Sequence, residues 1–253
     1  MGSRPELKTK QLLDAIVGAL DEDVISDFQR AKILRDAKAL MDLDAGAAHM
    51  VFGALACVDF DFESMHYHHK LSIQLKPQDY QTRCNYSVSL ERAGFIQESI
   101  DILGEAVMLA PEDVGILARL FDKQYHGLRF SGAKETANLL RARAPNFDLS
   151  RYTDIGIFEK MLMDWGWSED YVCMQVDFAF ELLRTHRARC LAHELFAVTD
   201  FQDSSIYLSL HIKAELDKVS AVADDLYVRM DEAFEDWNPA RLSITIEPSH
   251  VSA

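Results

Sequence analysis

The sequence has few cysteines and no long apolar run, and each scarcity narrows the kinds of protein it can be. Its cysteines lie far apart and form no C-x-x-C pair: Cys57, Cys84, Cys173 and Cys190. Neither a zinc knuckle nor a redox dithiol is indicated, and we expect buried free thiols of a reducing compartment. No apolar run approaches the ~20 residues of a membrane-spanning helix, and the N-terminus is too polar for a signal peptide. These features predict a cytoplasmic protein that does not bind membranes.

Basic charge and common catalytic motifs are also scarce. The chain has 26 Lys and Arg residues against 41 Asp and Glu residues. Residues 148–253 hold 20 acidic and 9 basic residues, a net −11, whereas residues 1–45 and 46–147 each carry −2. Nucleic acid is not expected as a partner, because binding phosphate requires a basic footprint. No G-x-G-x-x-G, G-x-x-x-x-G-K-[ST], H-E-x-x-H or G-x-S-x-G motif occurs, so the common phosphate, zinc and nucleophile signatures are missing.

Proline is scarce as well, but three of the six prolines are evenly spaced. Pro77, Pro111 and Pro145 lie 34 residues apart, and each ends a segment with two helical blocks. A fixed period of this length is typical of stacked helical hairpins. The sequence therefore predicts three helical hairpins over residues 46–147.

The three segments resemble tetratricopeptide repeats, whose pattern places large, small and aromatic residues at fixed offsets before a terminal proline. The matching positions before the three prolines are His49, Phe52, Gly53, Ala56, Met65 and His69, then Arg83, Tyr86, Ser87, Leu90, Ser99 and Leu103, then Leu117, Leu120, Phe121, Gln124, Ala133 and Ala137. Gly94 falls at the turn between the two helices of the middle repeat, and Gly127 falls one residue early in the third. The resemblance implies a mostly α-helical solenoid.

The flanking segments predict three further parts. Helical spacing over residues 6–20 and 26–41 indicates an N-terminal cap, residues 1–45, and helices over 153–164 and 168–188 indicate a connector, residues 148–190. Two alternating segments, 193–201 and 206–214, predict strands joined by a QDSS turn. A helix is expected over 215–237, and RLSITIEP predicts a third strand. We therefore expect an acidic ββαβ domain, residues 191–253, whose helix covers one face of the sheet.

The resemblance implies a partner site on the concave face of the repeats. By register, this groove includes Met50, Cys84, Asn85, Val88, Arg119, Asp122 and Tyr125, although packing between neighbouring helices accounts for these positions equally well. Related co-chaperones hold a C-terminal carboxylate with paired Lys and Asn side chains, and of these only Asn85 has a counterpart here. The groove is mildly apolar, which favours an amphipathic helix or an extended hydrophobic segment as the partner.

Two clusters of polar residues invite a functional interpretation. The 215–237 helix carries six carboxylates opposite an apolar stripe that ends in Phe234 and Trp237, which favours a solvated face over a metal site. If this face binds a partner, we expect that partner to be a protein whose basic surface contacts Asp224, Asp231 and Glu235. In the HYHH segment, His66 and His69 share a helix face, and structural histidines are favoured over metal ligands. No cofactor or metal is expected.

These observations favour a non-enzymatic adaptor or partner-specific chaperone that holds a peptide or helix of another protein. Short secretion chaperones with three repeats are similar in the repeat block, but they lack the added ββαβ unit. Two alternatives remain open. One is a hydrolase-like or nuclease-like enzyme with its chemistry in the C-terminal domain, and the other is an antitoxin-like or inhibitor-like protein that covers a basic surface with its acidic domain.

Overall fold

The computed structural model describes residues 5–149, 154–199 and 204–249, and its internal contacts divide the chain into two compact units. The first comprises Met1–Ala93 and Asp101–Ala110, and the second comprises Gly94–Ile100 and Pro111–Ala253. Helix α6 (Ile96–Leu109) contributes residues to both units. No helix among the described residues has both the length and the apolar character that crossing a membrane requires.

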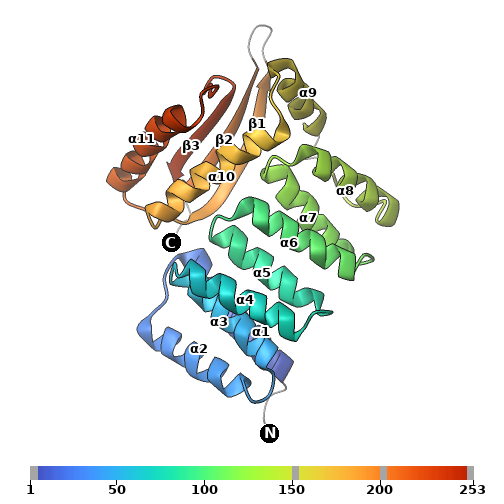
Figure 1. Ribbon diagram of the computed structural model, residues 1–253, viewed down its shortest axis with the longest axis vertical. Helices are drawn as coiled ribbons and strands as arrows, with labels where there is room; N and C mark the ends of the chain where they lie inside the picture. Colours follow the sequence, from blue (N-terminus) through green and yellow to red (C-terminus); the bar gives the residue numbers. More distant parts are fainter. Residues whose placement is uncertain (1–4, 150–153, 200–203, 250–253) are drawn as a thin grey trace. The chain divides into compact units, whose positions relative to one another are not determined.

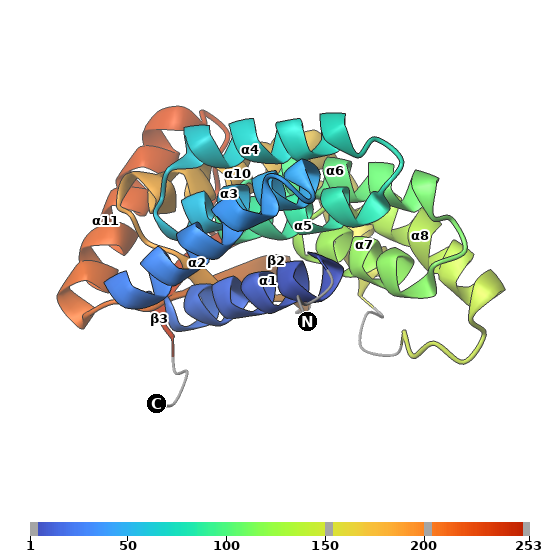
Figure 2. The same ribbon diagram turned by 90° about the horizontal axis from the view of Figure 1, so that it is seen from below.

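The first unit is an array of short helices (Figure 1). Besides its part of α6, it contains α1 (Pro5–Glu22), α2 (Asp27–Leu40), α3 (Ala45–Val58), α4 (Phe62–Leu75) and α5 (Tyr80–Arg92). Helices α3 and α4 lie side by side (Figures 1 and 2), and α3 also contacts α1, α2 and α5. A capping box is present at the start of α2, with the Ser26 side chain accepting from the Gln29 backbone N–H. Helix α3, apolar on nearly all sides, forms the centre of this unit.

The second unit combines helices with a small sheet. Its helices are α7 (Val114–His126), α8 (Phe130–Arg143), α9 (Ile155–Trp165), α10 (Glu169–Thr185) and α11 (Leu216–Ala233). The strands are β1 (Cys190–Thr199), β2 (Ser204–Ile212) and β3 (Leu242–Pro248), in the order β1-β2-β3. Strand β1 is antiparallel to β2, and β2 is parallel to β3. The expected helical repeat followed by a small α+β domain is therefore confirmed.

The 34-residue period is visible in the helix boundaries. Helices α4, α6 and α8 begin at Phe62, Ile96 and Phe130 and end at residues 75, 109 and 143, two residues before each evenly spaced proline. The first helix of each pair is capped by an aspartate, Asp44, Asp79 or Asp113, whose carboxylate accepts backbone N–H groups of the first turn. Because such caps satisfy N–H groups that the helix leaves unpaired, they fix where each helix starts. The helical repeat is thus confirmed as an architecture.

Each of the three hairpin turns has one residue in the left-handed conformation, at the same repeat position. Phe60, Gly94 and Leu128 have φ values of 57°, 80° and 62°, again 34 residues apart. The predicted position of Gly94 at the turn is therefore confirmed, and in the third turn Leu128, not Gly127, has the left-handed conformation. Gly127 has a different role, because a Cβ atom there would lie 2.7 Å from Cδ1 of Ile100. Glycine at 127 permits close packing, and Leu128 bears the backbone strain.

A buried histidine organises the contact of α3, α4 and α5. His69 is completely buried, its Nε2 lies 2.8 Å from Oγ of Ser89, and its ring stacks on Tyr86 with centroids 4.8 Å apart. A Cβ atom on Gly53 would lie 2.6 Å from this ring. The absence of a side chain at Gly53 of α3 therefore leaves the space that the His69 ring of α4 fills.

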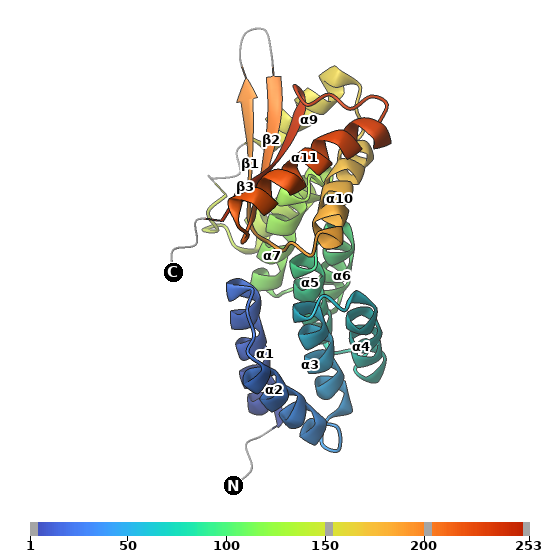
Figure 3. The same ribbon diagram turned by 90° about the vertical axis from the view of Figure 1, so that its left-hand side faces the viewer.

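The sheet has one strongly apolar face. Ile206, Leu208, Leu210 and Ile212 alternate along β2 and are all buried, as the sequence pattern predicts. Helices α10 and α11 lie on the same side of the sheet (Figure 3), and α11 contacts both α10 and β3. A helix that covers one face of the sheet was expected, and the structure contains it.

Several predicted boundaries in this region differ from the structure. Strand β1 begins at Cys190 instead of residue 193, because its pairing with β2 continues past a bulge to Ile212. Helix α11 ends at Ala233 instead of residue 237, since Phe234 is extended, with φ −127° and ψ 102°. Trp237 and Glu235 therefore lie beyond the helix. Strand β2 begins at Ser204 instead of residue 206, so two residues of the predicted QDSS turn belong to the strand. The other two, Gln202 and Asp203, lie outside the described residues.

Candidate functional site

The predicted groove residues of the first unit are only partly accessible. Met50 and Cys84 are 6% and 3% exposed, so they are core residues of the folded chain. Asn85 and Val88 are half-buried, and the Asn85 amide donates to the Gln81 carbonyl at 2.8 Å. Only Asn85 and Val88 of this set offer a partial surface to a partner.

The predicted groove residues of the second unit also differ from one another in their exposure to solvent. Tyr125 is 4% exposed and packs edge-on against Phe158, with centroids 5.9 Å apart. Burial is the main reason that the pKa of Tyr125 is raised to about 12. The Asp122 carboxylate lies 3.6 Å from Nδ1 of His126, and Arg119 is exposed. Tyr125 therefore stabilises the unit, whereas Arg119 and the half-exposed Asp122 side chain are accessible.

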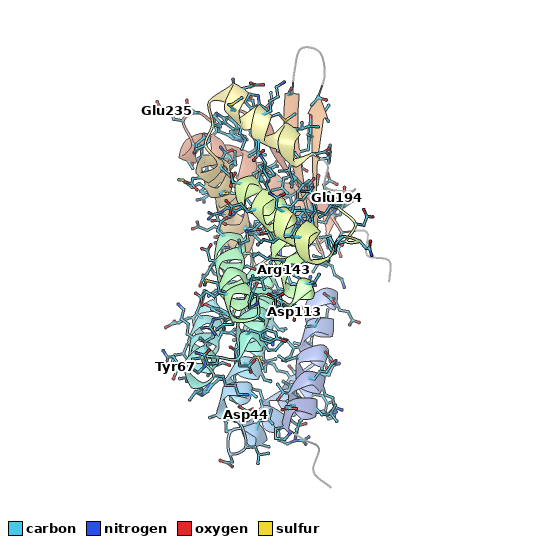
Figure 4. All side chains as sticks on the ribbon, turned by 90° about the vertical axis from the view of Figure 1, so that its right-hand side faces the viewer. Asp44, Tyr67, Asp113, Arg143, Glu194 and Glu235 are labelled. Atoms are coloured by element: carbon cyan, nitrogen blue, oxygen red, sulfur yellow. The ribbon has the colours of Figure 1, made fainter. Side chains whose placement is uncertain are left out.

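Of the three carboxylates predicted on the acidic face of the C-terminal helix, Asp224 and Asp231 lie on the helix and Glu235 does not. Asp224 and Asp231 are exposed on α11, but Glu235 follows the helix and points outward at its end (Figure 4). Asp225 forms close contacts, with His186 Nε2 at 2.8 Å and Arg229 Nε at 3.1 Å. The hydrogen bond from His186 is the main reason that the pKa of Asp225 is lowered. The acidic face of α11 thus combines solvated carboxylates with one structural ion pair.

Of the histidines in the HYHH segment, His66 and His69 both contact Tyr86, whereas His68 contacts His49. His66 Nδ1 lies 2.6 Å from the Tyr86 hydroxyl, and His68 Nδ1 lies 2.9 Å from Nδ1 of His49. Burial lowers the pKa of both His49 and His68. Within the described ranges, no three His, Cys, Asp or Glu side chains are placed to hold one metal ion.

A pocket with aromatic walls lies within the second unit, and we call it the α6–α10 pocket. Its volume is about 430 Å³, and its lining residues are Gly94, Phe95, Gln97, Glu98, Met174, Asp177, Phe178, Glu181, Arg184 and Phe234. Residues 94–98 span the start of α6, and residues 174–184 follow one face of α10. Phe234 reaches the pocket because the chain becomes extended where α11 ends.

The pocket combines apolar side chains with an excess of carboxylates. Phe178 and Phe234 contact edge to face, with centroids 5.5 Å apart, and Met174 is 60% exposed. The Arg184 guanidinium lies 4.2 Å from the centre of the Phe95 ring and donates to the Gly94 carbonyl. Burial lowers the pKa of Arg184.

Three carboxylates in the lining, against one guanidinium, make the pocket acidic: Glu98, Asp177 and Glu181. An apolar floor with negative charge around it can bind a ligand that is itself apolar and positively charged.

Sequence reasoning missed this pocket, although α10 carries a signal. Met174, Asp177, Phe178 and Glu181 follow the i, i+3, i+4, i+7 spacing of one helix face, with an exposed methionine and a phenylalanine beside two acids. The aromatic partners Phe95 and Phe234 are distant in sequence, so no local pattern joins them to this face.

No protein-family model matches the chain, and no curated protein is similar to it in sequence.

Proposed function

We propose that this chain is a non-enzymatic, tetratricopeptide-like repeat protein that binds a segment of a partner protein in the α6–α10 pocket. The family assignment is supported by the 34-residue recurrence of the helix starts and of the left-handed turn residues. The partner site is supported by the aromatic side chains and the carboxylates that line this pocket. We place the partner there because Met50, Cys84 and Tyr125 of the predicted groove are buried.

The partner segment should carry an apolar side chain flanked by Lys or Arg. Apolar anchors in desolvated pockets provide most of the binding energy in many interfaces, and Met174 with the pocket phenylalanines offers such a floor. Phenylalanine faces also attract cations, as the contact of Arg184 with Phe95 already illustrates. The surrounding carboxylates disfavour acidic segments and accelerate association with basic ones.

A peptide selection tests this proposal. We expect a displayed library of random peptides, selected on the full chain, to enrich sequences with a large apolar residue next to Lys or Arg. The enriched peptides are then synthesised, and their affinity is measured by fluorescence anisotropy.

Two methionine variants provide the matched comparison. Met174→Lys should weaken binding at least about tenfold, because it removes an apolar contact and adds a repelling charge. Met163→Lys on α9 should leave the affinity unchanged, since Met163 is even more exposed, at 73%, and lies outside the pocket. Enrichment of acidic peptides, or equal binding by both variants, would contradict the proposal.

A further inference from the structure

All the tryptophans of the chain gather at one pocket of the second unit. The sequence contains three tryptophans, and each lines a pocket of about 440 Å³, which we call the tryptophan pocket. Its full lining is Trp165, Gly166, Trp167, Glu235, Asp236, Trp237, Asn238, Pro239 and Arg241. This pocket shares no residue with the α6–α10 pocket, so it is a second, separate feature of the same unit.

Two turns of the backbone bring these side chains together. Helix α9 ends at Trp165, and Gly166 turns the chain with a left-handed φ of 71°. The Trp167 backbone N–H then donates to the Leu162 carbonyl at 2.9 Å. On the other side, the segment between α11 and β3 forms a turn in which the Arg241 N–H donates to the Asn238 carbonyl.

The aromatic rings form angled walls around a cation that the chain itself provides. Trp165 and Trp167 have centroids 5.4 Å apart and an interplanar angle of 69°. The Arg241 guanidinium lies 5.9 Å from the first ring centre and 5.6 Å from the second. It also donates to the Trp165 carbonyl at 3.4 Å. Arg241 therefore already occupies the position that a cationic ligand would take between these two rings.

The polar lining offers both donors and acceptors. Glu235 and Asp236 present exposed carboxylates, and the Asn238 side-chain oxygen accepts from the Ala240 N–H. The indole nitrogen of Trp237 is buried, and no described residue accepts a hydrogen bond from it. Because this nitrogen is closed to solvent, the side-chain acceptors that a ligand can reach are those of Glu235, Asp236 and Asn238.

These properties distinguish between classes of ligand. A phosphorylated ligand such as a nucleotide would meet the repulsion of two carboxylates, and Arg241 precludes a cation between the rings. A purely apolar ligand would leave the charged lining without partners. The ligand must therefore be uncharged and must also offer hydrogen-bonding groups to the polar lining. A neutral sugar meets both conditions, because its C–H face packs on an aromatic ring and each hydroxyl both donates and accepts hydrogen bonds.

We propose that the tryptophan pocket binds a neutral carbohydrate, with a sugar ring packed on an indole face that Arg241 does not cover and its hydroxyls bonded to the Asp236 carboxylate. The chain would then recognise a glycan in addition to the protein segment proposed above.

Intrinsic fluorescence reports on this site alone, because the chain has no tryptophan elsewhere. A broad glycan array first identifies the preferred neutral oligosaccharide, and that oligosaccharide is then titrated to millimolar concentration while tryptophan emission is recorded. We expect a saturable change in emission. Isothermal calorimetry on the same pair should give the same dissociation constant.

Variants separate a specific site from incidental quenching. Asp236→Ala, at an exposed position, should weaken the affinity at least tenfold without loss of folding, and Trp165→Ala should abolish it. Asp224→Ala, an exposed acid of α11 outside the pocket, and Met174→Lys should bind the sugar as the wild type does. An array without any neutral glycan bound, saturable binding of a nucleotide instead, or normal binding by Asp236→Ala and Trp165→Ala would overturn the proposal.

Discussion

At the residue scale, the stability of the first unit depends on a histidine that is buried in its neutral form. His69 has a pKa of about 3, mainly because burial disfavours the charged imidazolium. Its ring lies against Tyr86, and Gly53 leaves the space that the ring fills. Two predictions follow from this single packing arrangement.

The first prediction concerns the loss of stability at acidic pH. The folded-state pKa of His69 lies below the ordinary value of 6.5, so the unfolded chain binds more protons as the pH falls below that value. The contribution of His69 to stability is therefore complete above pH 6.5 and decreases as the pH falls toward 3. At pH 5 the loss should be about 2 kcal/mol. Urea unfolding at pH 7.5 and pH 5 measures it, and a His69→Gln variant that shows the same loss would contradict the assignment.

The second concerns Gly53. Replacement by Ala forces a methyl group against the His69 ring, and overpacking of this kind costs about 1–3 kcal/mol. Gly104→Ala serves as the control, because no atom lies within 4 Å of the added Cβ and alanine favours helix. Urea midpoints should fall for the first variant and rise for the second. A Gly53→Ala protein as stable as the wild type would show that the histidine can move aside.

At the element scale, the hairpin turns define where the paired helices end. Gly94 has a positive φ and lies close to Phe180, whose Cδ1 would be 3.0 Å from an added Cβ. Gly94→Val should therefore lower the free energy of unfolding by 1 kcal/mol or more, as an order-of-magnitude estimate. Gly104→Val, in an open helix position, should have a small effect. Thermal melting of the two variants tests the turn, and equal melting temperatures would argue against strain at Gly94.

Also at the element scale, the C-terminal helix α11 ends four residues earlier than the sequence predicts. Its apolar spacing continues through Phe234 and Trp237, so periodicity alone extends the helix to residue 237. The structure ends it at Ala233 because Phe234 packs against Phe178 of α10. A tertiary contact thus takes precedence over the local pattern.

At the scale of the whole molecule, the uneven charge affects which partners can bind. Residues 148–253 carry a net −11, and this field should accelerate association with basic peptides in dilute salt. Reversing Asp224 and Asp231 to Lys should slow association modestly, because both are exposed and screened. Reversing Asp177 and Glu181 should also raise the dissociation rate, since they line the pocket. Stopped-flow kinetics at two salt concentrations would separate these effects, and salt-independent association would contradict the charge argument.

The sequence by itself determined the repeat and the class of the fold. Prolines, aspartate caps and apolar spacing act within a few residues of their own position, so the 34-residue period and the ββαβ order follow from local chemistry alone. The left-handed Gly94 was predictable for the same reason, because glycine is the residue that adopts this conformation without strain.

Only the tertiary structure decided which residues form sites. Met50, Cys84 and Tyr125 have the right register for a groove, but their burial depends on neighbours that a helix register does not specify. Phe95, Phe178 and Phe234 meet at one pocket, and Trp165, Trp167 and Trp237 meet at another, although each set comes from distant segments. Such convergence is set by how helices pack on each other and on the sheet. Local periodicity reports which face of an element is apolar, but not which distant element that face will meet.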